Sequence, residues 1–266
     1  MTDYMTNPAQ LFDVSGKVAL ITGATGAFGQ VAAKSLGRVS CKLVLAGGNQ
    51  QALETLAAEL GAEGAETVTV NLRPNTEAHC EAMVSAAKEA FGQLDILVVA
   101  SGMNDVDPIQ DLSQERWQKV MDANVRDSWM MCKAAGQQFM AQGGGGKVVL
   151  VSSARGKLGH PAGYSAYCPS KSAVDGLTRA LACEWGKHSI TVNAIAPTVF
   201  RSDLTAWMFA DEEPGKSTRE GMLARIPLGR LGEPEDLAGP LIFLVSPASN
   251  FHTGHIVYAD GGYTAG

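Results

Sequence analysis

The stretch from Thr22 to Gly29 reads "TGATGAFG", follows an apolar run and opens a segment with helical spacing. Glycines let a backbone approach a phosphate closely, and a helix N-terminus offers N–H donors and a favourable dipole to an anion. Glycine loops also occur as plain tight turns, but this one stands between a predicted strand and a predicted helix. That context favours a dinucleotide-binding cradle at Gly23, Gly26 and Gly29.

Outward from this loop, apolar stretches of strand length alternate with longer stretches of helical spacing. We expect strands at residues 17–22, 42–46, 67–70, 94–100, 147–153, 191–195 and 255–259. We expect helices at residues 30–38, 50–60, 76–91, 114–140, 166–186 and 233–244. The strands are rich in valine, isoleucine and leucine without polar alternation, which is typical of strands buried on both faces. The pattern predicts an α/β fold, a doubly wound parallel sheet (Rossmann fold) in three α/β/α layers.

The chain shows no internal repeat and no linker, so we expect a single domain. Residues 1–10 form a polar N-terminal extension, and residues 11–266 form the dinucleotide-binding catalytic domain. Residues 198–225 are a long connection before the last helix, in which Trp207 and two apolar neighbours precede an acidic run. Long connections in compact domains are often functional, so we expect a substrate lid there.

Composition excludes several classes of partner. The chain has 266 residues, 45% of them apolar, and a formal net charge of −6 without a basic stripe, which argues against nucleic acid. Its five scattered cysteines favour a reducing cytoplasm, and its isolated histidines lack metal-ligand spacing, so we expect no metal. Residues 237–259 are uncharged but interrupted by glycine and proline, and no signal peptide is visible. We therefore expect no membrane association.

The stretch "LAGGN", Leu45 to Asn49, ends the second predicted strand, where the adenosine ribose of a dinucleotide is recognised. NAD is commonly selected there by an Asp or Glu, and NADP by an Arg. Gly47 and Gly48 supply neither group. Two glycines in a protein of net negative charge give the 2′-phosphate of NADP(H) no partner. We therefore expect an NAD(P)(H) cofactor, with NAD(H) favoured over NADP(H). Arg73 or Lys42 reaching that phosphate would reverse this preference.

The stretch "GYSAYCPSK" supplies the candidate catalyst. Tyr167 and Lys171 are four residues apart, so they share a helical face. An ammonium group beside a phenol lowers the phenol pKa and suits it to general acid/base work on an alcohol or carbonyl. Tyr164 has no such partner, and a plain surface pair is the alternative for Tyr167 and Lys171. Ser153 ends the fifth strand, where its hydroxyl could bond a developing oxyanion.

Taken together, these motifs resemble the single-domain branch of the short-chain dehydrogenase/reductase family. The resemblance covers nearly the whole chain and includes the glycine loop, Asn124 in "NVRDSW", Ser153, the Tyr167–Lys171 pair, "NAIAP" at 193–197 and "DGG" at 260–262. The spacing of the three glycines departs from this branch and looks more like the epimerase branch. The ends of the chain look like those of gluconate 5-dehydrogenase-type members.

The resemblance implies roles for individual residues. Tyr167 is the acid/base, Lys171 lowers its pKa and holds the nicotinamide ribose, and Ser153 positions the substrate oxygen. Asn124 anchors a water that relays protons, a role that rests on resemblance alone. The implied cofactor contacts are Gly23, Thr25, Gly26, Phe28, Gly29, Gly48, Asn49, Asn71, Leu72, Ala100, Ser101, Gly102, Tyr167, Lys171, Pro197, Thr198, Val199 and Ser202.

The substrate is expected to be a small secondary alcohol or ketone, with polyols and sugar acids as the first guess. Arg155 and His160 follow the catalytic serine on a loop that should rim the site, and could draw in an acidic or hydroxylated molecule. Tyr164 and Trp207 could line or cover it, although such residues often only pack. The resemblance also implies a homo-oligomer, a tetramer or dimer.

Three functions are compatible with the sequence. The first is an NAD(P)-dependent oxidoreductase acting on CH–OH groups. The second is an NAD-retaining epimerase or dehydratase, which the glycine spacing suggests and the short chain argues against. The third is a non-catalytic dinucleotide sensor, which would have no reason to keep Tyr167 and Lys171 beside Ser153.

Overall fold

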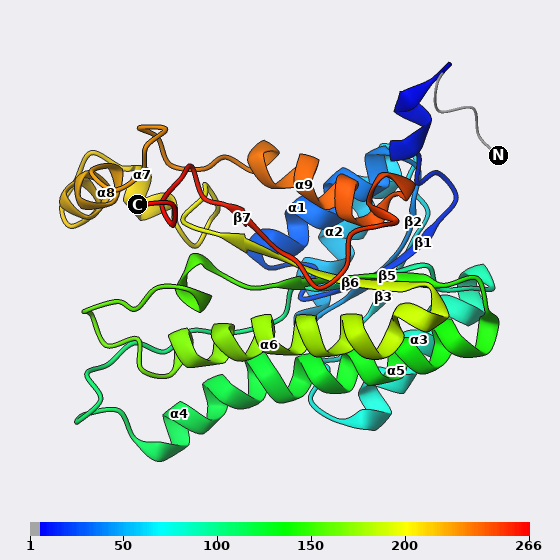
Figure 1. Ribbon diagram of the computed structural model, residues 1–266, viewed down its shortest axis with the longest axis horizontal. Coiled ribbons are helices and arrows are strands. Elements are labelled where there is room, and N and C mark those ends of the chain that lie inside the picture. The colour runs from blue at the N-terminus through cyan, green and yellow to red at the C-terminus, as the bar shows by residue number, and fades with distance from the viewer. Residues whose placement is uncertain (1–5) are drawn as a thin grey trace.

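A parallel sheet of seven strands forms the centre of the computed structural model, which describes residues 6–266 (Figure 1). The strands are β1 Val18–Thr22, β2 Lys42–Ala46, β3 Thr67–Val70, β4 Ile96–Val99, β5 Gly146–Val151, β6 Ile190–Pro197 and β7 Ile256–Ala259. Their order is β3-β2-β1-β4-β5-β6-β7, and every neighbouring pair is parallel. The doubly wound Rossmann fold predicted from the sequence is confirmed.

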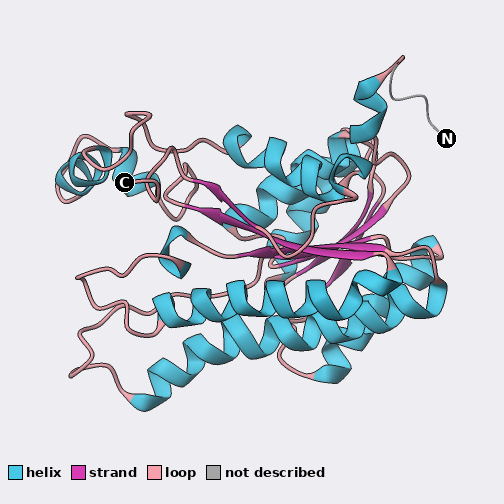
Figure 2. Ribbon diagram, in the orientation of Figure 1, coloured by secondary structure: helices cyan, strands magenta, loops and turns pink. Residues whose placement is uncertain are grey.

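Helices cover both faces of this sheet, as Figure 2 shows for the layers. One face carries α1 Ala27–Arg38, α2 Gln50–Ala62 and α9 Glu235–Val245, and the other carries α3 Glu77–Phe91, α5 Asp127–Gln142 and α6 Tyr167–Trp185. The helix α4 Gln114–Met121 extends from the second layer, and α7 Ala206–Phe209 and α8 Gly215–Leu223 lie in the predicted lid. Within residues 6–266, no helix is long and apolar enough to cross a membrane.

The N-terminal extension predicted at residues 1–10 lies partly outside the described residues, since the structure begins at residue 6. A short 3-10 helix, Pro8–Phe12, follows, and its residues are not buried. The first strand starts at Val18, close to the predicted position.

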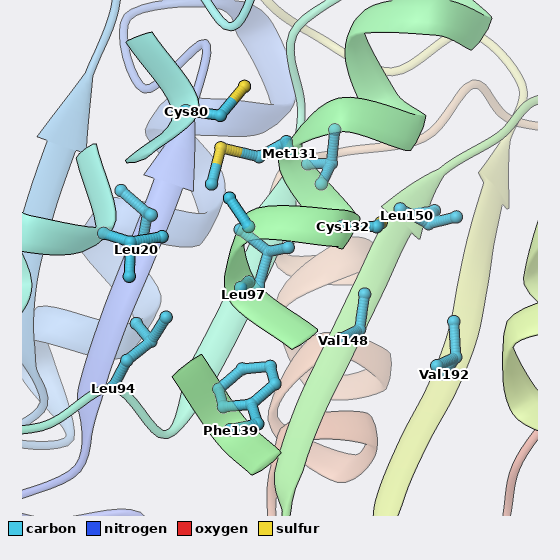
Figure 3. Packing of buried hydrophobic residues seen from close by; sticks show 14 of the residues in the cluster. Leu20, Cys80, Leu94, Leu97, Met131, Cys132, Phe139, Val148, Leu150 and Val192 are labelled. Carbon is cyan, nitrogen blue, oxygen red and sulfur yellow. The ribbon is translucent and has the colours of Figure 1, made fainter. Parts of the chain in front are cut away.

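The two faces of the sheet bury separate hydrophobic clusters. Towards α3, α5 and α6, Leu20, Leu97 and Val148 point from three strands into one cluster (Figure 3). Towards α1, α2 and α9, the alternate residues of the same strands, such as Ile21, form the second cluster. Strands with apolar side chains on both faces explain why the sequence shows runs of Val, Ile and Leu.

Two helix predictions need correction. The helix expected at 30–38 begins at Ala27, so the end of the glycine loop is itself the first turn of α1. The helix expected at 114–140 is not continuous, because a π-helical turn, Asp122–Arg126, separates α4 from α5. π-helical turns insert one residue into a helix and often mark functional sites. This one contains Asn124.

Phe139 on α5 tests the packing between helix and sheet. Its ring is 1% exposed and lies against Gly146, where an added β-carbon would come within 2.6 Å of the ring. Removing the ring leaves a cavity that the glycine cannot fill, so Phe139→Ala should lower the free energy of unfolding by about 3–5 kcal/mol. Phe139→Leu, which keeps much of the volume, should cost less. Urea titrations of the two variants and the wild type measure both losses; equal losses would contradict the cavity argument.

Candidate active site

The glycine loop between β1 and α1 allows a close approach that no side chain would permit. Gly23 has φ 62°, and a β-carbon on it would lie 2.8 Å from the Ser101 backbone. A β-carbon on Gly29 would lie 2.0 Å from the Gly23 carbonyl oxygen. The loop therefore presents bare backbone at the start of α1, beside the end of β4. This arrangement fits the pyrophosphate of a dinucleotide.

Apart from Tyr167 and Lys171 on α6, the predicted cofactor residues lie in the glycine loop after β1 and after four other strands, whose ends meet at one edge of the sheet. Gly48 and Asn49 follow β2, Asn71 and Leu72 follow β3, Ala100 to Gly102 follow β4, and Pro197 to Val199 and Ser202 follow β6. Because all strands are parallel, their carboxyl ends share this edge.

Some of these residues face a cavity, and others have structural tasks. A cavity of about 840 Å³ between α1 and α9 is lined by Thr25, Gly26 and Ser202, among other residues. The Phe28 side chain is buried in the core, which leaves only its backbone for a ligand. The Asn49 side chain caps α2 by accepting a hydrogen bond from the Ala52 amide at 3.1 Å.

Tyr167 is the first residue of α6, and Pro169 lies in the first turn, as the sequence predicts. Burial raises the pKa of the Tyr167 phenol, while a hydrogen bond with Ser153 and the charge of Arg155 act in the opposite direction. The pKa of Tyr167 is thus raised, where the sequence predicted a pKa lowered by Lys171. The Lys171 ammonium lies 5.6 Å from the Tyr167 ring centroid and donates elsewhere.

Lys171 is buried, with 6% of its surface exposed, and its Nζ donates to the Val151 carbonyl at 2.8 Å. Burial lowers the pKa of Lys171 to about 8, against the opposing charge of Asp175. A β-carbon on Gly102 would lie 2.7 Å from Asn124 Oδ1 and 3.8 Å from this Nζ, so it is the Asn124 side chain that requires glycine at 102. A cation held there faces the same edge of the sheet as the glycine loop.

Asn124 acts as a brace in this structure. Its Oδ1 accepts from the Met103 amide at 2.7 Å, and its Nδ2 donates to the Met103 carbonyl and to Ser170 Oγ, both at 2.9 Å. Both amide hydrogens are therefore used. The side chain ties the loop after β4 to α6, and its backbone carbonyl accepts from Ser128 Oγ at 2.8 Å.

Three of the four predicted substrate residues lie together beside Tyr167. The rings of Tyr164 and Tyr167 meet edge to face with centroids 6.0 Å apart, and those of His160 and Tyr164 are 4.4 Å apart. The Arg155 guanidinium lies 5.9 Å from the Tyr164 centroid. Trp207 is 49% exposed on α7, whereas its neighbour Met208 is buried.

Two further residues, Arg225 and Tyr263, belong to this cluster and were not predicted from the sequence. Arg155 donates to the Tyr263 hydroxyl at 2.9 Å, and the Arg225 guanidinium lies 4.3 Å from the Tyr263 ring centroid. Burial, with the charges of Arg155 and Arg225, lowers the pKa of His160. Across the described chain, neither guanidinium is ion-paired with a carboxylate. The aromatic residue directly after "DGG" was the one available signal.

The buried ammonium of Lys171 should make stability depend on pH. Its pKa of about 8 in the folded protein lies below the 10.5 of the unfolded chain, so the unfolded state binds more protons between these values. Stability from this group therefore rises with pH from about 8 to about 10.5, by on the order of 3 kcal/mol. Relative to Lys171→Met, the cofactor-free wild type should gain free energy of unfolding over this range. A difference between the two proteins that stays constant from pH 7 to 10 would contradict this.

Comparisons with known proteins agree with this geometry. A family model described as enoyl-(acyl carrier protein) reductase matches residues 23–264. An uncharacterized oxidoreductase of Mycobacterium tuberculosis is 55% identical over 96% of this chain and 93% of its own length. A 2-dehydro-3-deoxy-D-gluconate 5-dehydrogenase of Dickeya dadantii is 36% identical over 96% of this chain and 98% of its own.

Among solved structures, a gluconate 5-dehydrogenase from Burkholderia cenocepacia in complex with NADP and tartrate is similar with a TM-score of 0.90. It is 26% identical, and the match covers 98% of this chain and 100% of that one. The resemblance drawn from the sequence motifs is confirmed. The chain belongs to the short-chain dehydrogenase/reductase family and is a nicotinamide-dependent oxidoreductase acting on CH–OH groups.

Proposed function

We propose that this protein interconverts a secondary alcohol and a ketone in a hydroxylated carboxylic acid, of the sugar-acid class, with Tyr167 as the proton carrier. The observation that supports this most is the position of Tyr167. Its phenol is hydrogen-bonded with Ser153 on one side and adjoins the cluster of His160, Arg155 and Tyr164 on the other. An acid/base and uncompensated positive charge thus occupy one site.

A bound nicotinamide supplies or accepts the hydride. In ketone reduction, the Ser153 hydroxyl donates to the carbonyl oxygen, and Tyr167, kept protonated by its raised pKa, gives its proton to the same oxygen. In alcohol oxidation, Tyr167 takes the hydroxyl proton. Lys171, charged below about pH 8, favours the phenolate that donation leaves behind. Asn124 holds α6 and the loop that follows β4 in fixed positions relative to each other, through its hydrogen bonds with Ser170 and Met103.

The cofactor lies, in this proposal, along the carboxyl edge of the sheet, from the bare loop at Gly23 and Gly29 to Lys171. The sequence favours NAD(H), because Gly47 and Gly48 offer a 2′-phosphate no partner. That preference assumes that no basic residue reaches Gly48. Arg73 does reach it, and its guanidinium occupies the space beside Gly48. The choice between the two nicotinamides therefore depends on Arg73.

A carboxylate on the substrate is supported by charge. Arg155 and Arg225 flank the buried ring of Tyr263, without a carboxylate partner in the described part of the chain, although the whole protein carries a net charge of −6. Guanidinium groups bind carboxylates with two parallel hydrogen bonds. The Burkholderia gluconate 5-dehydrogenase holds tartrate, a hydroxy dicarboxylate, and the Dickeya relative is named for a sugar acid.

Residues 198–225 serve, in this proposal, as the substrate lid. The segment contains α7 and α8 and lies close to the C-terminus of the chain (Figure 1). Its residues Phe209 and Met222 pack against a small cluster that includes Tyr263 and Ala154. Because Arg225 stands at the end of this segment, closing the lid would bring its charge over the substrate.

We also propose a domain organisation, an oligomeric state and a cellular location for this protein. Residues 11–266 form one catalytic domain of a cytoplasmic homo-oligomer, with exposed Trp129 and Met140 of α5 available for subunit contacts. The Dickeya and Burkholderia relatives are named as dehydrogenases, which favours hydride transfer over the epimerase and the non-catalytic sensor.

Replacing Tyr167 by phenylalanine tests the proton carrier. Loss of a general acid/base should lower kcat by about 10²–10⁴-fold and leave cofactor binding largely intact, because the ring is kept. Tyr258→Phe, a matched change on β7, should keep kcat. Steady-state rates and cofactor titrations on the three proteins measure this. Full turnover by Tyr167→Phe would remove Tyr167 from the mechanism.

Replacing Arg225 by methionine tests the substrate carboxylate. We expect KM for a sugar acid such as gluconate to rise by about tenfold or more, since a charge-assisted hydrogen bond is lost, with kcat changed less. KM for a neutral polyol of similar length should stay within about twofold, which separates charge recognition from a disturbed lid. Lys216→Met removes another lid cation and serves as control. An equal rise in KM for acid and polyol would count against a carboxylate site.

A further inference from the structure

The side chain of Arg73 lies directly over Gly48. A β-carbon built on Gly48 would be 2.3 Å from Arg73 Nε and 3.1 Å from both Cζ and Nη2. Arg73 follows β3 and Gly48 follows β2, two neighbouring strands that end at the same edge. The two segments are joined there by a hydrogen bond of 3.2 Å from the Gly47 amide to the Val70 carbonyl.

Gly48 and Arg73 are complementary in shape. Any side chain at position 48 would collide with the guanidinium, so the absence of one is what lets Arg73 cross from β3 to the end of β2. The guanidinium then occupies the position from which an arginine at the end of the second strand accommodates a 2′-phosphate in dinucleotide-binding folds. Glycine at 48 therefore makes room for a cation that comes from elsewhere in the chain.

The charge of Arg73 is not neutralised by the protein. Over residues 6–266, its guanidinium has no ion pair or hydrogen bond, whereas three cations of α1 and β2 do. Lys34 pairs with Glu59 at 2.7 Å, Arg38 with Glu63 at 2.8 Å and Lys42 with Glu66 at 3.1 Å. Lys42 also stands at the amino end of β2, away from the ribose position. Arg73 is thus the cation left for a ligand.

No acidic side chain stands at this point to repel a phosphate. The residues after β2 are Gly47, Gly48 and Asn49, and the Asn49 side chain is turned to the cap of α2. An Asp or Glu at this place would bind a ribose 2′-hydroxyl and exclude a 2′-phosphate. Positions 47 to 49 therefore add no negative charge beside the Arg73 guanidinium.

We propose that Arg73 binds the 2′-phosphate of NADP(H) and that this protein therefore selects NADP(H) over NAD(H). Gly48 leaves the space that the Arg73 guanidinium occupies. This inference rests on the proposed function, since it concerns the cofactor of the same reaction. Arginine presents its donors in a planar fork that matches phosphate oxygens, which a lysine cannot reproduce. The preference is therefore specific to arginine as well as to positive charge.

Binding of fragments that carry no nicotinamide tests the proposal without any turnover. The purified full-length protein is titrated calorimetrically with adenosine 2′,5′-bisphosphate and with AMP, two fragments that differ only in the 2′-phosphate. NADPH and NADH are titrated in the same way. We expect the 2′-phosphorylated member of each pair to bind at least about tenfold more tightly. Equal binding, or tighter binding of AMP and NADH, would overturn the proposal while leaving the dehydrogenase function intact.

Variants assign the effect to the residue. Arg73→Met should abolish the preference by weakening the 2′-phosphorylated ligands and leave affinity for AMP and NADH within about twofold; Arg73→Lys should retain part of it. Arg38→Met, the same change at an arginine paired with Glu63, should alter neither. Gly48→Asp, which displaces the guanidinium and adds a carboxylate, should favour NADH. If Arg73→Met lost affinity for all four ligands while its thermal unfolding was unchanged, Arg73 would not be specific for the 2′-phosphate.

One outcome concerns both proposals. If the wild type binds neither NADPH nor NADH, the proposed oxidoreductase function fails, and the assignment of Arg73 fails with it. If NADH binds and NADPH does not, only the assignment of Arg73 fails. The two results are distinguishable in the first titration.

Discussion

The contact between Gly29 and the Gly23 carbonyl is the constraint on which the rest of the site depends. A β-carbon at position 29 would sit 2.0 Å from that oxygen, so α1 reaches β1 only because glycine stands there. This approach places the α1 N-terminus at the carboxyl edge of the sheet, where the other strand ends also arrive. Helix dipole, bare backbone and the ends of β4, β5 and β6 then face one region.

Around that region the protein keeps positive charge that it does not neutralise. Lys171 is buried with a pKa lowered to about 8, and Arg155, Arg225 and Arg73 have no carboxylate partner within the described residues. Elsewhere on the surface, arginines such as Arg38 and Arg230 are paired. Unpaired cations cost stability when buried, and they are useful where an anion must bind. These cations are therefore available to an anion that binds at this edge of the sheet.

Sequence reasoning was most successful where the physical signal is local. The strands were placed within a few residues because side chains buried on both faces produce unbroken apolar runs, and Tyr167 was placed at the start of α6 by Pro169. The start of α1 was missed, because Gly29, with its low helix propensity, lies in the first turn and Gly26 precedes it. The π-helical turn at Asn124 was missed because the residues on both sides of it keep the spacing of a continuous α-helix.

What the sequence could not show are contacts between segments that are far apart. The pKa of Tyr167 depends on burial and on Ser153 and Arg155, so the spacing to Lys171 alone gave the wrong direction. The sequence showed no cation at Gly48, because the side chain that lies beside Gly48 belongs to Arg73, which follows the next strand, 25 positions later. A glycine in such a position leaves space for a neighbouring side chain. Only the three-dimensional structure identifies that side chain and its charge. A cofactor preference predicted from a single sequence position is therefore least dependable where a glycine stands in place of the expected charged residue.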